Sequence, residues 1–115
     1  MRADLRQIAP SLLVLLLGAC TETPAPVSDC SPQAQWRAGL ERRLPDPTCS
    51  EDAAKEAHLL GTELAGLRAE FAEIGERLRG ASEDQAGALQ RRQRQLQIDI
   101  EAIESEARIQ GWMQD

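Results

Sequence analysis

The stretch that decides the fold spans residues 57 to 107 and reads AHLLGTELAGLRAEFAEIGERLRGASEDQAGALQRRQRQLQIDIEAIESEA. Its apolar residues recur at alternating spacings of three and four, which is the pattern of helices with one apolar seam. The first seam contains Ala57, Leu60, Leu64, Leu67, Phe71, Ile74 and Leu78, and the second contains Ala86, Leu89, Gln93, Leu96, Ile100, Ile103 and Ala107. The seams differ in phase, because continuing the first one would bring polar and charged residues into the core. The pattern therefore predicts two helices and not one.

The turn between these helices falls at residues 80–82. Gly80 is suited to end the first helix, and Ser82 followed by Gln85 forms a capping box that begins the second. The short connection predicts an all-α fold, with a coiled-coil-like antiparallel helical hairpin over residues 50–112. We expect Ser50 to cap the first helix.

The position of the turn also predicts a register, in which facing residue numbers add up to about 160. This register pairs Leu64 with Leu96 and brings Glu70 near Arg92. The residues expected to form the hairpin core are Leu60, Leu64, Leu67, Phe71, Leu89, Leu96, Ile100 and Ile103. Three glycines weaken the first helix by up to about 1 kcal/mol each, so packing has to stabilise it.

A segment bounded by two cysteines, residues 30–49, precedes the hairpin. Ser31 and Pro32 are typical of a helix start, and prolines at positions 45 and 47 prevent a long continuation. We therefore expect a short or frayed helix within residues 32–43. Its apolar side would carry Trp36, Leu40 and Leu44.

The N-terminus has the layout of an export signal over residues 1–19. An apolar run from Ile8 to Leu17 would reach only about 15 Å as a helix, against roughly 30 Å for a bilayer core. Residues 17–20 read Leu-Gly-Ala-Cys, which resembles the lipobox of bacterial lipoproteins. The resemblance implies cleavage before Cys20 and membrane anchorage through acyl chains on Cys20. An ordinary signal peptide with a chance cysteine and an uncleaved buried helix are the alternatives.

Residues 20–29 would then form a lipidated tether. Their sequence after the cysteine, TETPAPVSD, has too little apolar surface for a core and suits a semi-rigid spacer. In the family that the lipobox resembles, an Asp after the cysteine acts as an inner-membrane retention signal. Thr21 stands there instead, so the resemblance implies the outer membrane, with the chain facing the periplasm.

With Cys20 acylated, two thiols remain in an oxidising compartment, and a Cys30–Cys49 disulfide is the simple outcome. A disulfide between chains and two free thiols are the alternatives. The closed loop would lie at the open end of the hairpin. There we expect Trp36, Leu40 and Trp112 to form a small apolar cluster, although recognition by exposed tryptophans is the other interpretation.

The composition argues against several classes of function. The 115-residue chain has a formal net charge of -6, one His and 3% aromatic residues, which does not suit a nucleic-acid partner. We expect His58 on the solvent side of the first helix, without a second ligand or base beside it. The sequence predicts no enzyme, no cofactor, no metal site and no small-molecule substrate.

The acidic excess gathers near the open end of the hairpin. Residues on the flanks of the two seams form a candidate partner face there, made of Glu56, Glu63, Asp99 and Glu106. Facing carboxylates repel each other slightly, and nothing within the hairpin compensates them. The interpretations are a solvated acidic surface, a docking face for a basic partner, or a weak divalent-cation site.

A second resemblance concerns residues 44–49, which read Leu-Pro-Asp-Pro-Thr-Cys and are followed by Ala53, Ala54 and Lys55. They are similar to the C…DPxC pattern of small entry-exclusion lipoproteins of conjugative transfer systems. That resemblance implies contact with the transfer apparatus, although the long hairpin after Lys55 departs from the shorter members. We therefore expect a non-catalytic structural or interaction module with a protein partner in the cell envelope, and a conjugation accessory role is the alternative.

Overall fold

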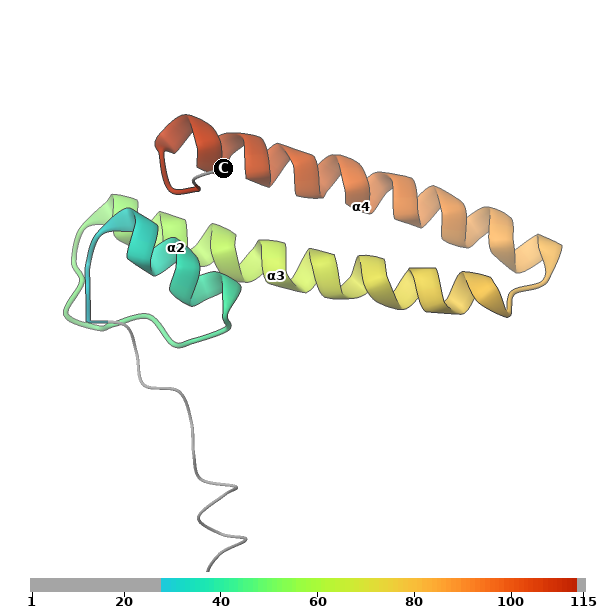
Figure 1. Ribbon diagram of the computed structural model, residues 1–115, viewed down its shortest axis with the longest axis horizontal. Helices are drawn as coiled ribbons and strands as arrows, with labels where there is room; N and C mark the ends of the chain where they lie inside the picture. The colour runs from blue at the N-terminus through green and yellow to red at the C-terminus, as the bar shows by residue number, and fades with distance from the viewer. Residues whose placement is uncertain (1–27, 114–115) are drawn as a thin grey trace, which may run out of the picture.

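The computed structural model of the chain describes residues 28–113, and within them it is entirely helical (Figure 1). The helices are α2 (Pro32–Leu40), α3 (Asp52–Arg79) and α4 (Glu83–Gln110). The all-α fold predicted from the seams is confirmed. The predicted signal peptide, Cys20 and most of the tether lie outside the described residues.

The long helices α3 and α4 form the predicted antiparallel hairpin (Figure 1). At the turn, the Ser82 hydroxyl accepts a hydrogen bond from the Gln85 amide, and the Gln85 side chain accepts one from the Ser82 amide. This reciprocal pair is the predicted capping box. α3 ends at Arg79 and Gly80 supplies its C-cap, so the turn falls where the sequence predicted it.

Every residue of the two predicted seams is buried or half-buried. The most enclosed members, at 5% exposure or less, are Ala57, Leu64, Ile74, Leu96 and Ala107. The others are half-buried, which is expected for two helices that have no further layer over much of their length. The burial pattern thus follows the spacing of three and four along both helices.

The register agrees with the predicted one in one place and departs from it in another. Two ion pairs cross the hairpin, Glu70 with Arg92 and Arg68 with Glu104, and their residue numbers add up to 162 and 172. The first total agrees with the predicted value of about 160, whereas the second exceeds it, and Leu64 packs in a cluster with Ala107 that does not include Leu96. Figure 1 shows the reason, because the first turn of α4 reaches beyond the end of α3. The loop therefore shifts the two seams relative to each other.

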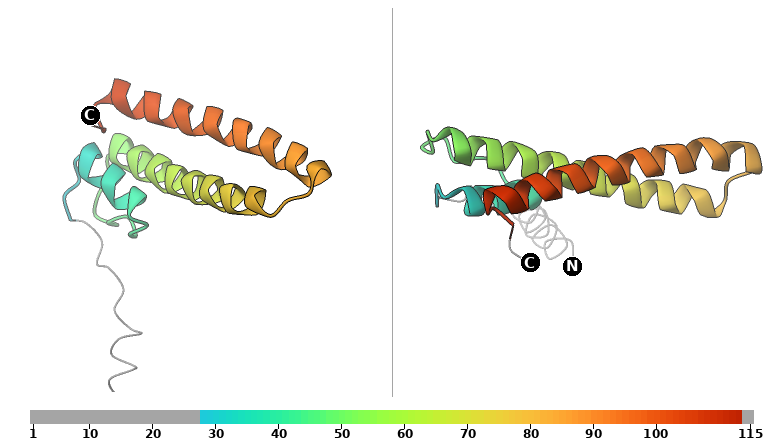
Figure 2. Two further views of the ribbon diagram at one scale, coloured as in Figure 1. Left: turned by 45° about the vertical axis from the view of Figure 1, so that its right-hand side comes forward. Right: turned by 90° about the horizontal axis from the view of Figure 1, so that it is seen from above.

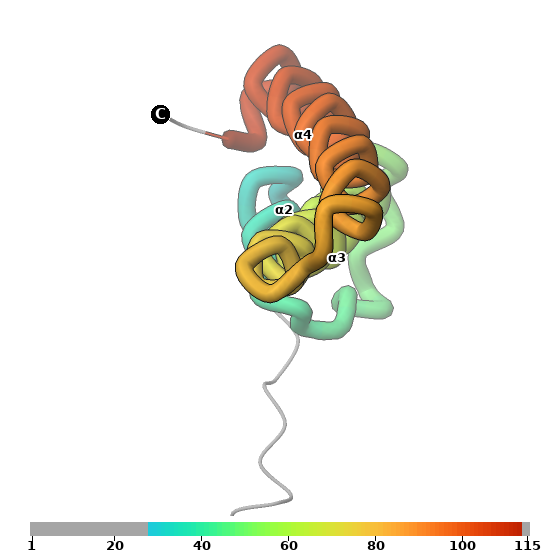
Figure 3. Tube along the Cα trace, turned by 90° about the vertical axis from the view of Figure 1, so that its right-hand side faces the viewer, coloured from blue at the N-terminus to red at the C-terminus, as the bar shows by residue number. Residues whose placement is uncertain are grey.

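The short helix α2 lies directly on α3 (Figure 2 and Figure 3). A Cβ atom added to Gly39 would lie 2.3 Å from the His58 carbonyl oxygen, and one added to Gly61 would lie 2.4 Å from the Trp36 carbonyl oxygen. The backbones approach each other closely because neither glycine carries a side chain. Ala54 of α3 is also completely buried. The two seams had not indicated this second contact face of α3.

The structure corrects one predicted helix end and shows how another helix terminates. The first long helix has Glu51 and not Ser50 as its N-cap, and the Glu51 side chain makes no capping bond. α2 is the short helix expected within residues 32–43, and it ends at Leu40 because the Arg42 and Arg43 amides turn back to the Gly39 and Ala38 carbonyls. This is a Schellman-type ending, with Arg42 in the left-handed region at φ 59°.

The early end of α2 changes the environment of Leu44. This residue was expected on the apolar side of the helix with Trp36, but it lies in the following loop and is 69% exposed. The residue before a proline disfavours helical geometry, so Pro45 reinforces the ending. The result is a loop of residues 41–50 that runs back along α3 with an exposed leucine.

Candidate functional site

The base of the hairpin, where α2, α3 and α4 meet, contains the hydrophobic core. Its buried members are Trp36, Ala57, Leu64, Ala107 and Trp112, with Leu40, Leu60, Ile100, Ile103 and Met113 packed against them. The two tryptophan rings have their centroids 5.9 Å apart at an interplanar angle of 35°. The predicted cluster is confirmed, and the tryptophans are 3% and 5% exposed, as core residues are.

A left-handed turn directs the end of the chain into this cluster. Gly111, at φ 78°, follows α4, and the Trp112 amide then donates to the Ala107 carbonyl over 2.9 Å. Glycine adopts this conformation without the steric cost that other residues incur. Gly111 therefore places Trp112 against Trp36 of α2.

The predicted Cys30–Cys49 disulfide is present, with the two Cα atoms 5.2 Å apart. It joins the start of the described chain to the end of the 41–50 loop. The buried Gln35 side chain donates to the Asp29 carbonyl over 2.7 Å, which fixes the segment before α2. The Asp29 carboxylate accepts from the Ser31 amide, and this hydrogen bond lowers the pKa of Asp29.

Hydrogen bonds hold the 41–50 loop against α3. The His58 ring Nε2 lies 2.8 Å from the Arg43 carbonyl oxygen, and the Arg42 guanidinium donates to the Ala65 carbonyl over 3.3 Å. His58 was expected on the solvent side, and it is half-buried under the loop. Within the loop, the Thr48 hydroxyl and amide donate to Asp46, and these bonds lower the pKa of Asp46.

Two surface depressions of about 390 Å³ each flank this loop. Pro45 and His58 line both of them, so the depressions are neighbours. Leu44 borders the first, and Leu59, which is 66% exposed, borders the second. We call this surface the loop patch, formed by Leu44, Pro45, Pro47, His58 and Leu59, with Arg42, Arg43, Asp46 and Lys55 at its rim. This patch could not be predicted from the sequence, because Leu44 was expected on the apolar side of the short helix.

The predicted partner face is distributed over both long helices. Glu56 and Glu63 are exposed on α3, one heptad apart. Asp99 and Glu106 are half-buried on α4, where they accept hydrogen bonds from Gln95 and Gln110 of their own helix. The carboxylates of Asp99 and Glu106 thus each accept a hydrogen bond from a glutamine amide on the same helix.

Charged pairs connect the helices further along the hairpin. Arg92 binds Glu70 through two hydrogen bonds, of 2.7 Å and 2.9 Å, as the sequence predicted. The guanidinium lowers the pKa of Glu70, and the same bond raises the pKa of Arg92. Arg68 binds Glu104 over 2.7 Å. This second pair was missed because the predicted register placed the two residues far apart.

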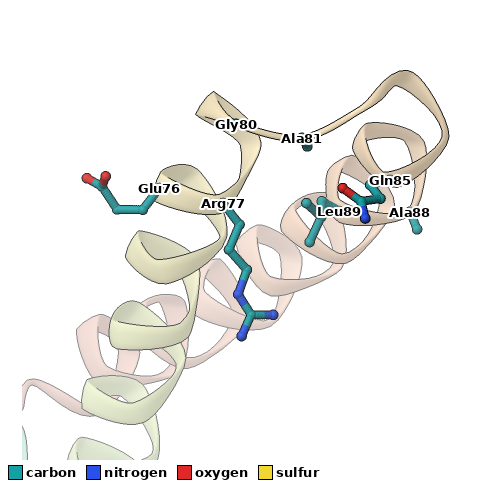
Figure 4. A pocket seen from close by; sticks show the side chains of 7 residues that line it. All are labelled: Glu76, Arg77, Gly80, Ala81, Gln85, Ala88 and Leu89. Carbon is teal, nitrogen blue, oxygen red and sulfur yellow. The ribbon is translucent and has the colours of Figure 1, made fainter.

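A further depression, of about 580 Å³, lies at the turn between α3 and α4 (Figure 4). Leu89 points into the space between the helices, whereas Glu76 points away from it. The lining residues are Glu76, Arg77, Gly80, Ala81, Gln85, Ala88 and Leu89. Glu76 and Arg77 are already engaged by Arg79 and Glu73. The arrangement offers an open hollow with a mixed polar and apolar lining and supplies no paired acid and base.

Residues 28–113 contain no group of three His, Cys, Asp or Glu side chains placed to hold a metal ion. The helices in this range are all too short or too polar to cross a bilayer. Comparison with family models, curated proteins and solved structures finds no match to the chain. The interpretation of function therefore depends on the residues and on the geometry described above.

Proposed function

We propose that the chain is an acylated lipoprotein of the outer membrane that holds a helical hairpin in the periplasm as a structural or interaction module. The observation that carries this proposal is that two of the three cysteines form a disulfide and the third ends a lipobox-like sequence. The disulfide takes Cys30 and Cys49, which leaves Cys20 as the one remaining cysteine of the chain. It stands at the end of Leu-Gly-Ala-Cys, where lipoproteins are acylated.

The geometry of the folded part supports a non-catalytic role. The buried tryptophans and leucines brace the base of the hairpin, and both long helices present charged outer faces. Such a hairpin can bind a partner along its length in the manner of a coiled coil. The candidate partner face of Glu56, Glu63, Asp99 and Glu106 would suit a basic protein of the cell envelope.

A role in conjugation, as an entry-exclusion or accessory lipoprotein, is the second candidate. Its motivation is the Asp46-Pro47-Thr48-Cys49 sequence, which the structure places in the loop that the disulfide closes. Genes of a transfer system next to the coding gene would support this role. A gene neighbourhood without them would rule against it.

Metabolic labelling tests the anchor. The full chain is produced in a bacterium supplied with an alkyne-labelled fatty acid, beside the Cys20→Ser variant. We expect label in the unmodified chain and none in the variant. Globomycin, which inhibits the lipoprotein signal peptidase, should cause an uncleaved precursor to accumulate. Equal labelling of both chains, or none in either, would refute the proposal.

A further inference from the structure

We propose that the loop patch rests on the lipid surface to which the chain is anchored, so that one defined side of the protein faces the membrane. The inference deepens the proposed function and depends on the acylation of Cys20. It concerns the side of α3 that carries the 41–50 loop. α4 lies on the opposite side of α3 (Figure 1 and Figure 3).

Exposed apolar side chains give the first argument. Leu44 and Leu59 are 69% and 66% exposed, and the two depressions that they border share Pro45 and His58 in their linings. Large aliphatic side chains that are exposed together on a folded surface mark an interaction site. The other large exposed hydrophobic residues of the described chain, Ile98 and Ile109, belong to α4.

Charge gives the second argument. The rim carries three cations, Arg42, Arg43 and Lys55, and one carboxylate, Asp46, although the whole chain has a net charge of -6. Arg43 forms an ion pair with the neighbouring Glu41 over 3.0 Å, so the net positive charge comes from Arg42 and Lys55. Lipid phosphates attract such cations, whose long aliphatic stems can lie along the acyl boundary. Leucines surrounded by Arg and Lys are the combination that interfacial membrane contacts use.

The covalent path of the chain gives the third argument. Cys30, where the folded part begins, is bonded to Cys49, which lines the second depression. The acylated Cys20 precedes Cys30 by ten residues, which span at most about 31 Å when extended. The loop patch is thus held near the bilayer at an effective concentration in the millimolar range, so even a weak contact with lipid is populated.

The patch is also fixed in shape before it meets a surface. The contact of His58 with the Arg43 carbonyl and the bond from Arg42 to the Ala65 carbonyl tie the loop to α3. Leu44 therefore does not have to be ordered on contact. A preorganised surface loses less conformational entropy when it binds.

The test uses tryptophan fluorescence on vesicles. Leu44→Trp is compared with Ile98→Trp, which places the same new side chain at a similarly exposed position on α4. Each full-length acylated protein is reconstituted into vesicles of phosphatidylethanolamine and phosphatidylglycerol, with and without bromine on the acyl chains. Trp36 and Trp112 are buried, so the unmodified protein gives the background.

We expect brominated lipid to remove about half of the added emission in Leu44→Trp and to leave Ile98→Trp unchanged, because bromine quenches only residues that reach the acyl boundary. Leu59→Trp repeats the measurement on α3, and circular dichroism verifies that each variant is folded. If the Leu44→Trp and Leu59→Trp variants bind vesicles but their emission is not quenched, the inference is wrong. The proposed acyl anchor would not be affected by that result. Equal quenching in Ile98→Trp would overturn it as well.

Two further outcomes separate the remaining explanations. A spectral shift of Leu44→Trp that grows with protein concentration, without vesicles, would show that a second copy covers the patch and would refute lipid contact. Protein that fails to float with the vesicles and carries no fatty-acid label overturns the anchor and this inference together. Flotation is therefore measured on the same samples.

Discussion

At the scale of single residues, two glycines determine how closely α2 and α3 approach. Gly39 and Gly61 lie against the backbone of the other helix, with less room than a methyl group needs. Gly66 and Gly75, on the same long helix, have nothing within 4 Å of an added Cβ atom. On α3, Gly61 thus permits a close helix contact, whereas Gly66 and Gly75 make no such contact. The difference depends only on what each glycine faces.

Alanine substitution tests this difference. Gly39→Ala and Gly61→Ala should each lower the free energy of unfolding by about 1–3 kcal/mol, because the new methyl group forces the helices apart. Gly75→Ala should raise it by up to about 1 kcal/mol, because alanine favours the helix and nothing obstructs the methyl group. Urea denaturation followed by far-UV circular dichroism measures all three. A neutral Gly39→Ala would contradict the close contact.

At the scale of elements, the two long helices begin in different ways. α4 begins with a reciprocal capping box between Ser82 and Gln85, whereas the N-cap of α3, Glu51, makes no side-chain bond. The tip of the hairpin is therefore fixed by local hydrogen bonds. The start of α3 is instead fixed by its neighbours, because the disulfide and the buried Ala54 lie beside it.

Substitutions of Ser50 and Ser82 test this difference between the N-termini of α3 and α4. Ser82→Ala should cost about 1 kcal/mol of stability, because the Gln85 amide loses its acceptor. Ser50→Ala should leave stability unchanged, since Ser50 is exposed and lies outside the cap. Thermal melts of both variants provide the comparison. If Ser50→Ala were the more damaging change, the observed start of α3 would be wrong.

The Glu70–Arg92 pair should make stability depend on pH. The pKa of Glu70 is lower in the folded state than its ordinary value of 4.5, so the pair stabilises the fold above that pH. This contribution is lost as the pH falls below the ordinary value and through the lowered one. Glu70→Gln should therefore reduce the melting temperature near pH 7 and have a smaller effect in acid.

A matched control accompanies this measurement. Glu63→Gln removes an exposed carboxylate from the same helix without breaking an ion pair of the described chain. The difference between the two variants should shrink at high salt, because both partners of the Glu70–Arg92 pair are accessible to solvent. A difference that does not change between pH 7 and pH 3 would show that the pair has no role in stability.

Several elements could be predicted from the sequence because the patterns that indicate them are local. Seam residues, the capping box and the glycine at the turn each depend on neighbours within a few positions. The register could be predicted only in part, since it depends on the path of the loop between the helices. The Gly39–Gly61 contact and the loop patch could not be predicted. Glycine carries no apolar signal, and the exposure of Leu44 results from where α2 ends.

At the scale of the whole molecule, the disulfide attaches the N-terminal segment to the base of the hairpin. α2 is nine residues long and would be marginal alone. The Cys30–Cys49 bond encloses it in a loop with a sequence separation of 19. The bond therefore keeps α2, and with it Trp36, beside the cluster that α3 and α4 complete.

Removing the disulfide should reduce the free energy of unfolding by about 3 kcal/mol in the chain-entropy description of a loop of this size. The Cys30→Ala/Cys49→Ala variant is compared with the unmodified protein by urea denaturation, with and without reductant. Reductant should destabilise the unmodified protein and leave the double variant unchanged. Equal stability of the two proteins without reductant would contradict a bracing role.

The contact between Trp36 and Trp112 has a consequence for the order of folding. It joins residues near opposite ends of the described chain, so its closure depends on contacts of long sequence separation. The packing of α2 on α3 joins residues that are closer in sequence, so it can form before α4 is in place. Trp112 then completes the cluster, after the turn at Gly111. Without Trp112, one face of Trp36 would be open to water, so the base of the hairpin is finished only when α4 has packed.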